Sequence, residues 1–243
     1  MKSTNPDDLE RLAAITPSGA MKRQIEDAIF ENLLATDPEA ALKRAKATDA
    51  PLVAAVQLAK IGASLLTSDP EKAFGIGADI LAACPEKLAP EKRIDIGSNN
   101  MSWGAEPNTA TKFMESLLIK DPSRTLEMTT AGSDTVSATF RDLSRKWAER
   151  DLPAYTDWVN HQSDPGIRNA AASQIVSQLS SQGHFQEAAE WAMSGQKPDP
   201  GNLYNLAIQW SRSNREDASA WVESVNVSED VKSNLRSFLK HNE

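Results

Sequence analysis

Leu33-Leu34-Ala35-Thr36-Asp37-Pro38 is the stretch that decides the fold, because its pattern returns along the chain. An apolar residue is followed, after three others, by a turn-forming residue, and a new helical segment then begins. The pattern occurs at Leu33 to Asp37, Leu65 to Asp69, Leu117 to Asp121, Trp147 to Asp151, Leu179 to Gly183 and Trp210 to Asn214. Successive turn residues are 32, 52, 30, 32 and 31 positions apart. Four of these intervals have the length of two packed helices with their turns, which predicts tandem helical hairpins.

The turn residues explain why each helix ends where it does. In Asp37-Pro38, Asp69-Pro70 and Asp121-Pro122 an N-cap acceptor precedes a proline at the first position of the next helix. The missing N–H of proline is no loss there, because that group has no partner within the helix. Proline also disfavours helical geometry at the residue before it, which ends the incoming helix. Gly183 and Asn214 are expected to end their helices through their tolerance of left-handed geometry.

The segments between the turns have helical spacing. Apolar residues recur at i, i+3, i+4 and i+7, and no stretch has the alternation of β-branched residues that is typical of strands. We therefore predict an all-α fold, a right-handed α-solenoid of about six antiparallel helical hairpins with a C-terminal capping helix. The paired helices are expected at residues 21–36 with 38–47, 51–68 with 70–83, 90–103 with 107–120, 135–150 with 152–161, 166–182 with 184–194 and 202–213 with 215–225. The long interval indicates an enlarged or irregular unit between Asp69 and Asp151.

The ends of the chain complete this organisation. Residues 1–20 are expected to form an N-terminal lead-in, and residues 21–243 a single helical repeat domain, because no linker rich in Gly or Ser divides the chain. The capping helix is expected over 228–240. It should present an apolar stripe to the preceding pair while its outside stays polar. The stripe consists of Val231, Leu235, Phe238 and Leu239. A closed C-terminal end of this kind favours a monomer.

Composition argues against two classes of partner. With 243 residues, a net charge of −8 and a pI near 5.0, the chain is too acidic to favour nucleic-acid binding, which depends on neutralising phosphates. Its basic cluster of Arg141, Arg145, Lys146 and Arg150 is interpreted as a solvated helix face. The mean hydropathy of −0.46 and the absence of an apolar run near the roughly 20 residues that a spanning helix needs argue against membrane insertion.

The compartment follows less directly from the sequence. The first twenty residues lack a basic start followed by an apolar stretch, so no signal peptide is expected. The chain as given is predicted to be soluble and cytoplasmic, and a periplasmic location stays open if a signal has been removed. The single cysteine, Cys84, excludes an intramolecular disulfide and fits a reducing compartment.

Residues that usually carry catalysis or bind metal are not grouped. The three histidines are far apart in the sequence, and none has a metal-ligand companion at i+3 or i+4. Walker, Gly-x-Ser-x-Gly and dinucleotide-binding motifs are absent as well. Gly75 and Gly77 lie within a helical stretch, where close helix packing explains them. We predict no catalytic residue, no metal site and no cofactor.

Six tryptophans are the most unusual feature of the composition. Trp158, Trp191 and Trp221 recur at intervals of 33 and 30 in predicted second helices. Trp147 and Trp210 occupy matching positions in first helices. This periodicity predicts core residues that fill the space between helices, and an exposed aromatic platform for a ligand is the alternative. The sixth, Trp103, fits the repeat least well.

One unit resembles a known repeat family. Gly183-His184-Phe185-Gln186-Glu187-Ala188-Ala189-Glu190-Trp191 resembles the turn and second helix of a tetratricopeptide repeat, with its Gly, its aromatic residue and its Ala after Glu in place. Pro200, twelve residues beyond Ala188, lies where that motif closes. Ala172, Ile175, Val176 and Leu179 replace the Trp, Leu, Gly and Tyr of the first-helix signature, and earlier units carry Asp-Pro. The likeness covers about 60 residues and implies a divergent tetratricopeptide-like protein.

The resemblance also implies where a partner binds. The first helices of the pairs would line a concave surface, which carries Arg141, Arg145, Ser173, Ser177 and Tyr204 as the binding candidates. The predicted function is that of a non-enzymatic scaffold for a protein or peptide partner. The alternative is a helical enzyme or small-molecule binder with a site near the irregular 84–135 segment.

Overall fold

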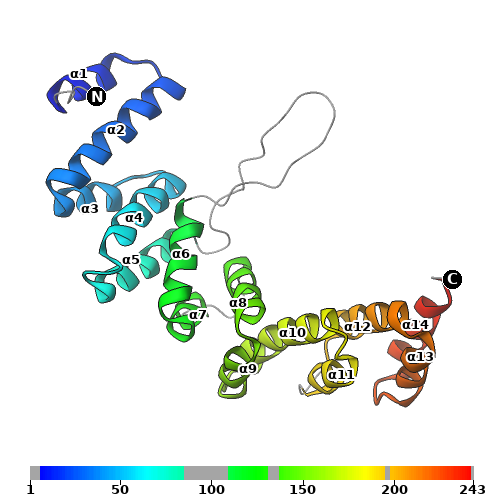
Figure 1. Cartoon of the computed structure of the whole chain (residues 1–243). Helices are drawn as coiled ribbons and strands as arrows, with labels where there is room; N and C mark the ends of the chain where they lie inside the picture. The colour runs from blue at the N-terminus through cyan, green and yellow to red at the C-terminus, as the bar shows by residue number, and fades with distance from the viewer. Residues whose placement is uncertain (1–5, 85–108, 131–136, 195–197, 242–243) are drawn as a thin grey trace. The chain divides into compact units, whose positions relative to one another are not determined.

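The structure, a computed structural model, describes residues 6–84, 109–130, 137–194 and 198–241 (Figure 1). The regular structure in these ranges is α-helical and contains no strand, so the all-α prediction is confirmed for the described residues. The chain divides into two compact units, Met1–Thr129 and Thr130–Glu243. Each unit is described by itself.

The first unit begins with a short helix within the predicted lead-in and continues as antiparallel helices. Its helices are α1 (Pro6–Ile15), α2 (Ala20–Thr36), α3 (Pro38–Lys46), α4 (Pro51–Leu65), α5 (Pro70–Ala83), α6 (Thr109–Lys120) and α7 (Pro122–Thr130). Each of α1 to α5 packs against the next, and α6 packs against both α4 and α5.

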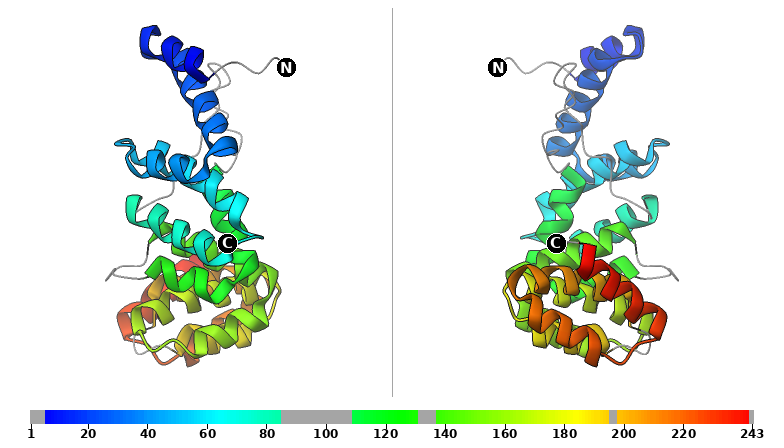
Figure 2. Two further views of the ribbon diagram at one scale, coloured as in Figure 1. Left: turned by 90° about the vertical axis from the view of Figure 1, so that its left-hand side faces the viewer. Right: turned by 90° about the vertical axis from the view of Figure 1, so that its right-hand side faces the viewer.

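The second unit contains seven helices among its described residues. They are α8 (Ala138–Arg150), α9 (Leu152–Asn160), α10 (Pro165–Ser181), α11 (Phe185–Met193), α12 (Pro200–Ser213), α13 (Arg215–Ser224) and α14 (Glu229–His241). The helices α8, α10, α12 and α14 contact one another in sequence, and α9, α11 and α13 each pack beside their neighbours in the chain. Figure 2 shows α12 and α14, in orange and red, from two sides.

The helix pairs were predicted correctly except around the irregular interval. The predicted helix 90–103 lies outside the described residues, and 107–120 corresponds to α6. The partner of α6 along the chain is α7, whose start at Pro122 the Asp121-Pro122 turn predicted, although the predicted helix pairs did not include it. The buried face of α7 is hard to recognise in the sequence, because two of its three buried residues are threonines, Thr125 and Thr129. Their hydroxyls donate to the carbonyls of Asp121 and Leu126, both at 2.7 Å.

One residue serves as the whole turn in most helix pairs. The N–H of Asp37 donates to the carbonyl of Leu33 at 2.7 Å and ends α2, while the Asp37 carboxylate accepts from the N–H of Ala40 at 2.9 Å and caps α3. Asp151 does the same between α8 and α9, with a φ of −152°. Asp69 caps α5 in the same way with a φ of −144°, but α4 already ends at Leu65. Where one residue forms the whole turn, the angle between the two helices is set by a single extended residue.

The prediction for Asn214 was wrong. Its φ of −150° is extended, not left-handed, and its side-chain oxygen accepts from the N–H of Asp217, so it acts as the aspartates do. The prediction for Gly183 was right, because its φ is 82°. Three residues, Gln182, Gly183 and His184, separate α10 from α11, and α11 starts after His184, whose side chain makes no capping bond.

The buried positions follow the turns with a constant register. Eight residues before the turn lies a large buried side chain in every pair, namely Ile29, Ile61, Phe113, Leu143, Ile175 and Leu206. Four residues after the capping residue lies another fully buried one, namely Ala41, Ala73, Thr125, Tyr155, Ala188 and Ala218. The second position is small except for Tyr155, whose buried hydroxyl donates to the carbonyl of Ala171 at 3.1 Å. Short side chains on the second helix let the large ones of the first helix fill the space between.

Two glycines in the first unit mark close helix contacts. A Cβ atom on Gly62 of α4 would collide with the ring of Phe113, and one on Gly77 of α5 would come within 2.6 Å of Leu117 Cδ1. Both large residues belong to α6. Packing was therefore the right explanation for Gly77. It was wrong for Gly75, which faces open space with nothing within 4 Å of a Cβ atom.

Ion pairs repeat at the start of the second helices of the first unit. Glu39 of α3 pairs with Lys72 of α5, and Glu71 of α5 pairs with Arg124 of α7 at 2.6 Å. In both pairs the carboxylate lies two residues after its turn aspartate and the cation three residues after the next one. The guanidinium of Arg124 also lies 4.2 Å from the ring centroid of Phe74. The pair α6–α7 thus follows α4–α5 in the same register as α4–α5 follows α2–α3, although 25 residues separate α5 from α6.

The tryptophans pack as the periodicity predicted. The ring centroids of Trp147 and Trp158 are 5.7 Å apart, and those of Trp210 and Trp221, at the equivalent positions, are also 5.7 Å apart. Trp147, Trp158 and Trp210 are buried, while Trp221 is half-buried, as is Trp191. Trp103 lies outside the described residues.

The helix α14 covers α12 and α13 at the end of the second unit. Leu235 and Leu239 are buried as predicted. Val231 is only half-buried, and Phe238 stays 44% exposed, with its ring 6.1 Å from that of Tyr204. The predicted apolar stripe is therefore half covered.

The capping role of Asp151 can be measured. Asp151→Ala removes the acceptor for the Ala154 N–H and should lower the free energy of unfolding by about 1 kcal/mol. Asp151→Ser keeps an acceptor and should therefore retain most of the stability that Asp151→Ala loses. Urea unfolding followed by far-UV circular dichroism makes the comparison, and equal midpoints for the Ala and Ser variants would contradict the capping role.

The glycines offer a matched test of helix packing. Gly75→Ala should stabilise the protein by up to about 1 kcal/mol, because alanine has the higher helix propensity and nothing is in its way. Gly62→Ala gains the same propensity but forces the buried Phe113 ring to move, and overpacking of this kind costs about 1–3 kcal/mol. Thermal unfolding of the two variants should therefore shift in opposite directions. A Gly62→Ala variant as stable as Gly75→Ala would show that α4 and α6 do not pack as described.

Candidate functional site

The binding candidates from the sequence all lie on α8, α10 and α12 of the second unit. Arg141, Ser173 and Tyr204 each lie ten residues before the turn of their helix pair. Arg145 and Ser177 lie six residues before it, one helical turn further on. Because α8 contacts α10 and α10 contacts α12, the structure brings the five residues to adjacent helices in a common register. We call these five residues the Arg141 strip.

The two arginines of the strip have different surroundings. Both are exposed. Arg145 is held by Asp142 at 2.5 Å and by Glu149 at 3.1 Å, and these hydrogen bonds, with that to Asp142 the stronger, raise the pKa of Arg145. Both carboxylates come from α8 itself, so the charge of Arg145 is neutralised locally. Arg141 has no side-chain partner among the described residues and is the cation of the strip that can pair with a ligand.

The hydroxyl-bearing residues of the strip are partly engaged. Ser173 is half-buried and its hydroxyl donates to the carbonyl of Ala170 at 2.6 Å. Ser177 is exposed. Tyr204 is half-buried with its ring against Phe238 of α14, so part of its surface belongs to the contact with the capping helix. The strip can thus offer hydrogen bonds and one free positive charge, which suits an extended polar segment.

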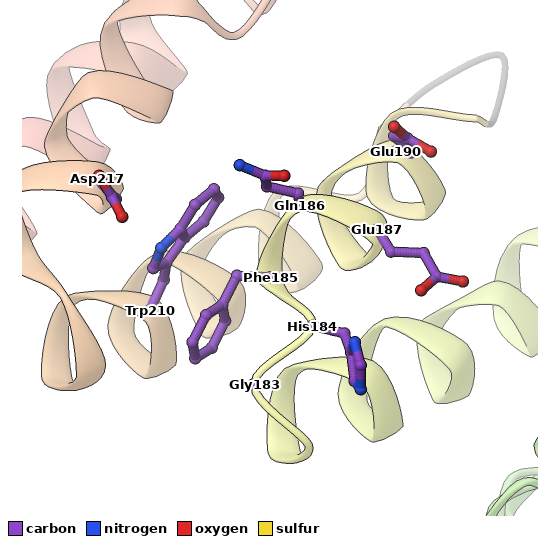
Figure 3. Close-up of a pocket in the computed structure, with 8 residues that line it drawn as sticks. All are labelled: Gly183, His184, Phe185, Gln186, Glu187, Glu190, Trp210 and Asp217. Atoms are coloured by element: carbon purple, nitrogen blue, oxygen red, sulfur yellow. The ribbon is translucent and has the colours of Figure 1, made fainter.

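A second surface of the same unit was missed from the sequence. A pocket of about 500 Å³ lies around the start of α11 (Figure 3). It is lined by Gly183, His184, Phe185, Gln186, Glu187, Glu190, Trp210 and Asp217. The rings of Phe185 and Trp210 stack with centroids 5.5 Å apart and planes 11° apart. The sequence suggested a helix start at His184 but could not show that α12 and α13 bring Trp210 and Asp217 beside it.

Shifted pKa values in the described residues have structural causes. Hydrogen bonds from Arg124 lower the pKa of Glu71, and those from Arg236, both 2.6 Å long, lower the pKa of Glu223. Burial raises the pKa of Tyr155 and of Cys84. These shifts accompany ion pairs and core packing and do not gather at one pocket.

The described residues hold no group of three His, Cys, Asp or Glu side chains that could bind a metal ion. In the same part of the chain no helix is long and apolar enough to cross a membrane. Of the 84–135 segment, in which an alternative site was considered, the structure describes Cys84, α6 and α7. Cys84 is buried and its thiol lies 3.7 Å from the carbonyl of Pro51, as expected of a packed residue.

No family model matches the chain, and the searches of curated proteins and of solved structures found no similar protein. The tetratricopeptide resemblance therefore stays a prediction that rests on residues 183–191 and Pro200.

The pair of Glu223 with Arg236 predicts a pH dependence. A carboxyl whose pKa is lower in the folded state stabilises the protein above its ordinary pKa of 4.5, and the effect is lost as the pH falls through the lowered value. Glu223→Gln should therefore lower the Tm slightly at pH 7, and the difference should disappear as the pH falls through the lowered pKa. Glu190→Gln, which removes an exposed carboxylate without an ion-pair partner, is the control and should have no such trend. Thermal melts across pH would contradict the pairing if both variants behaved alike.

Proposed function

We propose that the chain is a non-enzymatic scaffold that binds a peptide or protein partner. In this proposal the helix pairs form a right-handed α-solenoid of about six antiparallel hairpins with α14 as its cap. The first helices of the pairs line a concave face, and the Arg141 strip is the part of that face that contacts the partner.

The common register of the strip on α8, α10 and α12 is the observation that supports this most. Adjacent packed helices are about 8–10 Å apart. An extended peptide rises about 3.3 Å per residue, so equivalent positions on successive helices would meet every third residue of the peptide. Arg141, Ser173 and Tyr204 occupy such equivalent positions and offer a cation, a hydroxyl and a phenol. A partner that crosses the helices with an acidic residue near α8 would satisfy this arrangement.

The test is affinity capture with paired variants. Wild-type protein, Arg141→Glu and Ser177→Trp are immobilised and exposed to a lysate of the source organism. We expect a specific protein that wild type retains and both variants lose, because one reverses the free charge of the strip and the other blocks its centre. For a purified partner the expected loss of affinity is at least about tenfold, equivalent to about 1.4 kcal/mol.

Arg212→Glu provides the control, because Arg212 is exposed on α12 but lies outside the strip. It makes the same change of charge and should retain the partner. Melting temperatures of all variants show that the fold is intact. Partners that bind wild type and both strip variants equally would remove the strip from the proposal, and capture of no protein would contradict the scaffold itself.

A further inference from the structure

The exposed and half-buried positions of α10 and α12 are mostly polar but almost uncharged. The helix α10 has one charged residue among its 17, Arg168, and α12 has one among its 14, Arg212. By contrast, α8 has six among 13, and 25% of the whole chain is charged. Solvated faces of helices usually carry many charged residues, so solubility alone does not explain this composition.

Side-chain amides take the place of these charges. The helices α10 and α12 have three asparagine or glutamine residues each, whereas α9, α11 and α13 have two together. Gln174 and Asn205 each lie nine residues before the turn of their helix pair, and Gln178 and Gln209 lie five residues before it. We call these four residues the amide row. It lies beside the Arg141 strip, because two of its members directly follow strip residues in the sequence.

The amides of the row are available to a ligand. Gln174, Gln178 and Gln209 are half-buried, and Asn205 is exposed. None of the four side chains has a hydrogen-bond partner among the described residues. By contrast, the amide of Gln162 donates to a backbone carbonyl at 3.1 Å. The half-buried members are already restricted in part, which lowers the entropic cost of holding a ligand.

An extended peptide main chain has the hydrogen-bonding groups that the row can satisfy. A primary amide has two N–H donors and a carbonyl acceptor, and each peptide residue except proline has one N–H and one carbonyl. Covering neutral amides also avoids the cost of removing charges from water. The helices α10 and α12 pack together, and a helix spacing of about 8–10 Å equals three residues of an extended peptide at about 3.3 Å each.

We propose that the amide row binds the main chain of an extended peptide that crosses α10 and α12. This inference rests on the proposed function and gives the partner its chemistry. An acidic residue faces Arg141 on α8, and an uncharged extended segment continues over α10 and α12. Because the main chain supplies the contacts on these two helices, partners that share this pattern but differ in sequence bind to the same surface.

The test is binding of the full chain to a rhodamine-labelled peptide, Asp-Thr-Ala-Thr-Ala-Thr-Ala, measured by fluorescence anisotropy. Threonine favours the extended conformation. The peptide of reversed sequence is measured as well, and the tighter of the two is used further. We expect saturable binding, with a Kd that changes by less than about threefold when Val and Ser replace Thr and Ala. No saturable binding at up to about 1 mM peptide, or a Kd that changes more than about tenfold with these replacements, would overturn the proposal.

A scan of single N-methylated residues tests which groups of the peptide are bound. N-methylation removes one N–H and leaves the side chain in place. We expect two positions, three residues apart, at which the Kd rises at least about fivefold, because one N–H bonds to an amide of α10 and the other to an amide of α12. Loss of affinity at no position, at every position or with another spacing would overturn the proposal.

Matched variants assign the contacts to the amide row. Gln174→Met and Asn205→Leu keep the approximate size of the side chain but remove its hydrogen-bonding groups, and each should raise the Kd at least about threefold. Gln186→Met makes the same change at an exposed amide of α11 and should leave the Kd unchanged. Melting temperatures show that the variants are folded. Row variants that bind the peptide as tightly as the wild type would contradict the assignment.

The row and the strip can fail independently. For a peptide with Asn in place of its Asp, Arg141→Glu should leave the Kd unchanged, because the peptide has no charge that pairs with Arg141. A partner that is captured and then lost in Arg141→Glu, together with an N-methyl scan without effect, would keep the scaffold and overturn recognition of the main chain. The expected scan, together with unchanged binding of the Asp peptide to Arg141→Glu, would keep the amide row and remove Arg141 from the site.

Discussion

At Asp37, Asp151 and Asn214 a single residue ends one helix with its N–H and begins the next with its side-chain oxygen. Both hydrogen bonds hold the residue in an extended conformation with φ between −146° and −152°, so the two helices cannot slide or rotate independently. The positions of the side chains that are buried between the two helices have a constant sequence distance from that residue. This is why the large side chain eight residues before the turn and the small one four residues after it are buried in pair after pair. Because the turn is fixed, helix pairs of low sequence similarity bury side chains at the same positions relative to it.

The register also explains how successive helix pairs of the first unit pack against one another. The collision that a Cβ atom on Gly62 would have with Phe113 shows that α4 and α6 approach closely, and Phe113 occupies the position equivalent to Ile61. The ion pairs of Glu39 with Lys72 and of Glu71 with Arg124 repeat the same offsets along the second helices. Exposed pairs of this kind contribute little stability. Their value lies in showing that the 52-residue interval contains a regular pair, α6–α7, in register with its neighbours.

The sequence predicted the helices and most turns because proline, aspartate and apolar spacing act locally. The Asp121-Pro122 turn indicated the start of α7, but the predicted helix pairs left this helix out, because its buried residues Thr125 and Thr129 are polar in sequence and satisfy their hydroxyls on the backbone. The prediction failed for Asn214, because asparagine can be either a left-handed residue or an N-cap, and only the position of Asp217 decides between them. The strip could be predicted, since a constant period places its residues in register. The pocket could not, because Phe185, Trp210 and Asp217 belong to three helices and meet only after folding.

The pocket can itself be traced to the one turn that departs from the rule. At Gly183 the chain takes a left-handed residue and spends one more position, His184, before the next helix begins. The first helical position, which is proline in three other pairs, then falls on Phe185. A proline ring stays close to the backbone, whereas the phenylalanine ring extends to Trp210 on α12, the equivalent of Trp147 in the pair α8–α9. Trp147 is enclosed by Tyr155 and Trp158 on the next helix of its own pair, with centroids at 5.4 and 5.7 Å. Trp210 has only Trp221 from its own pair, and its other face is covered by Phe185 from the pair before. A change in one turn thus leaves an aromatic edge facing a pocket instead of a closed core.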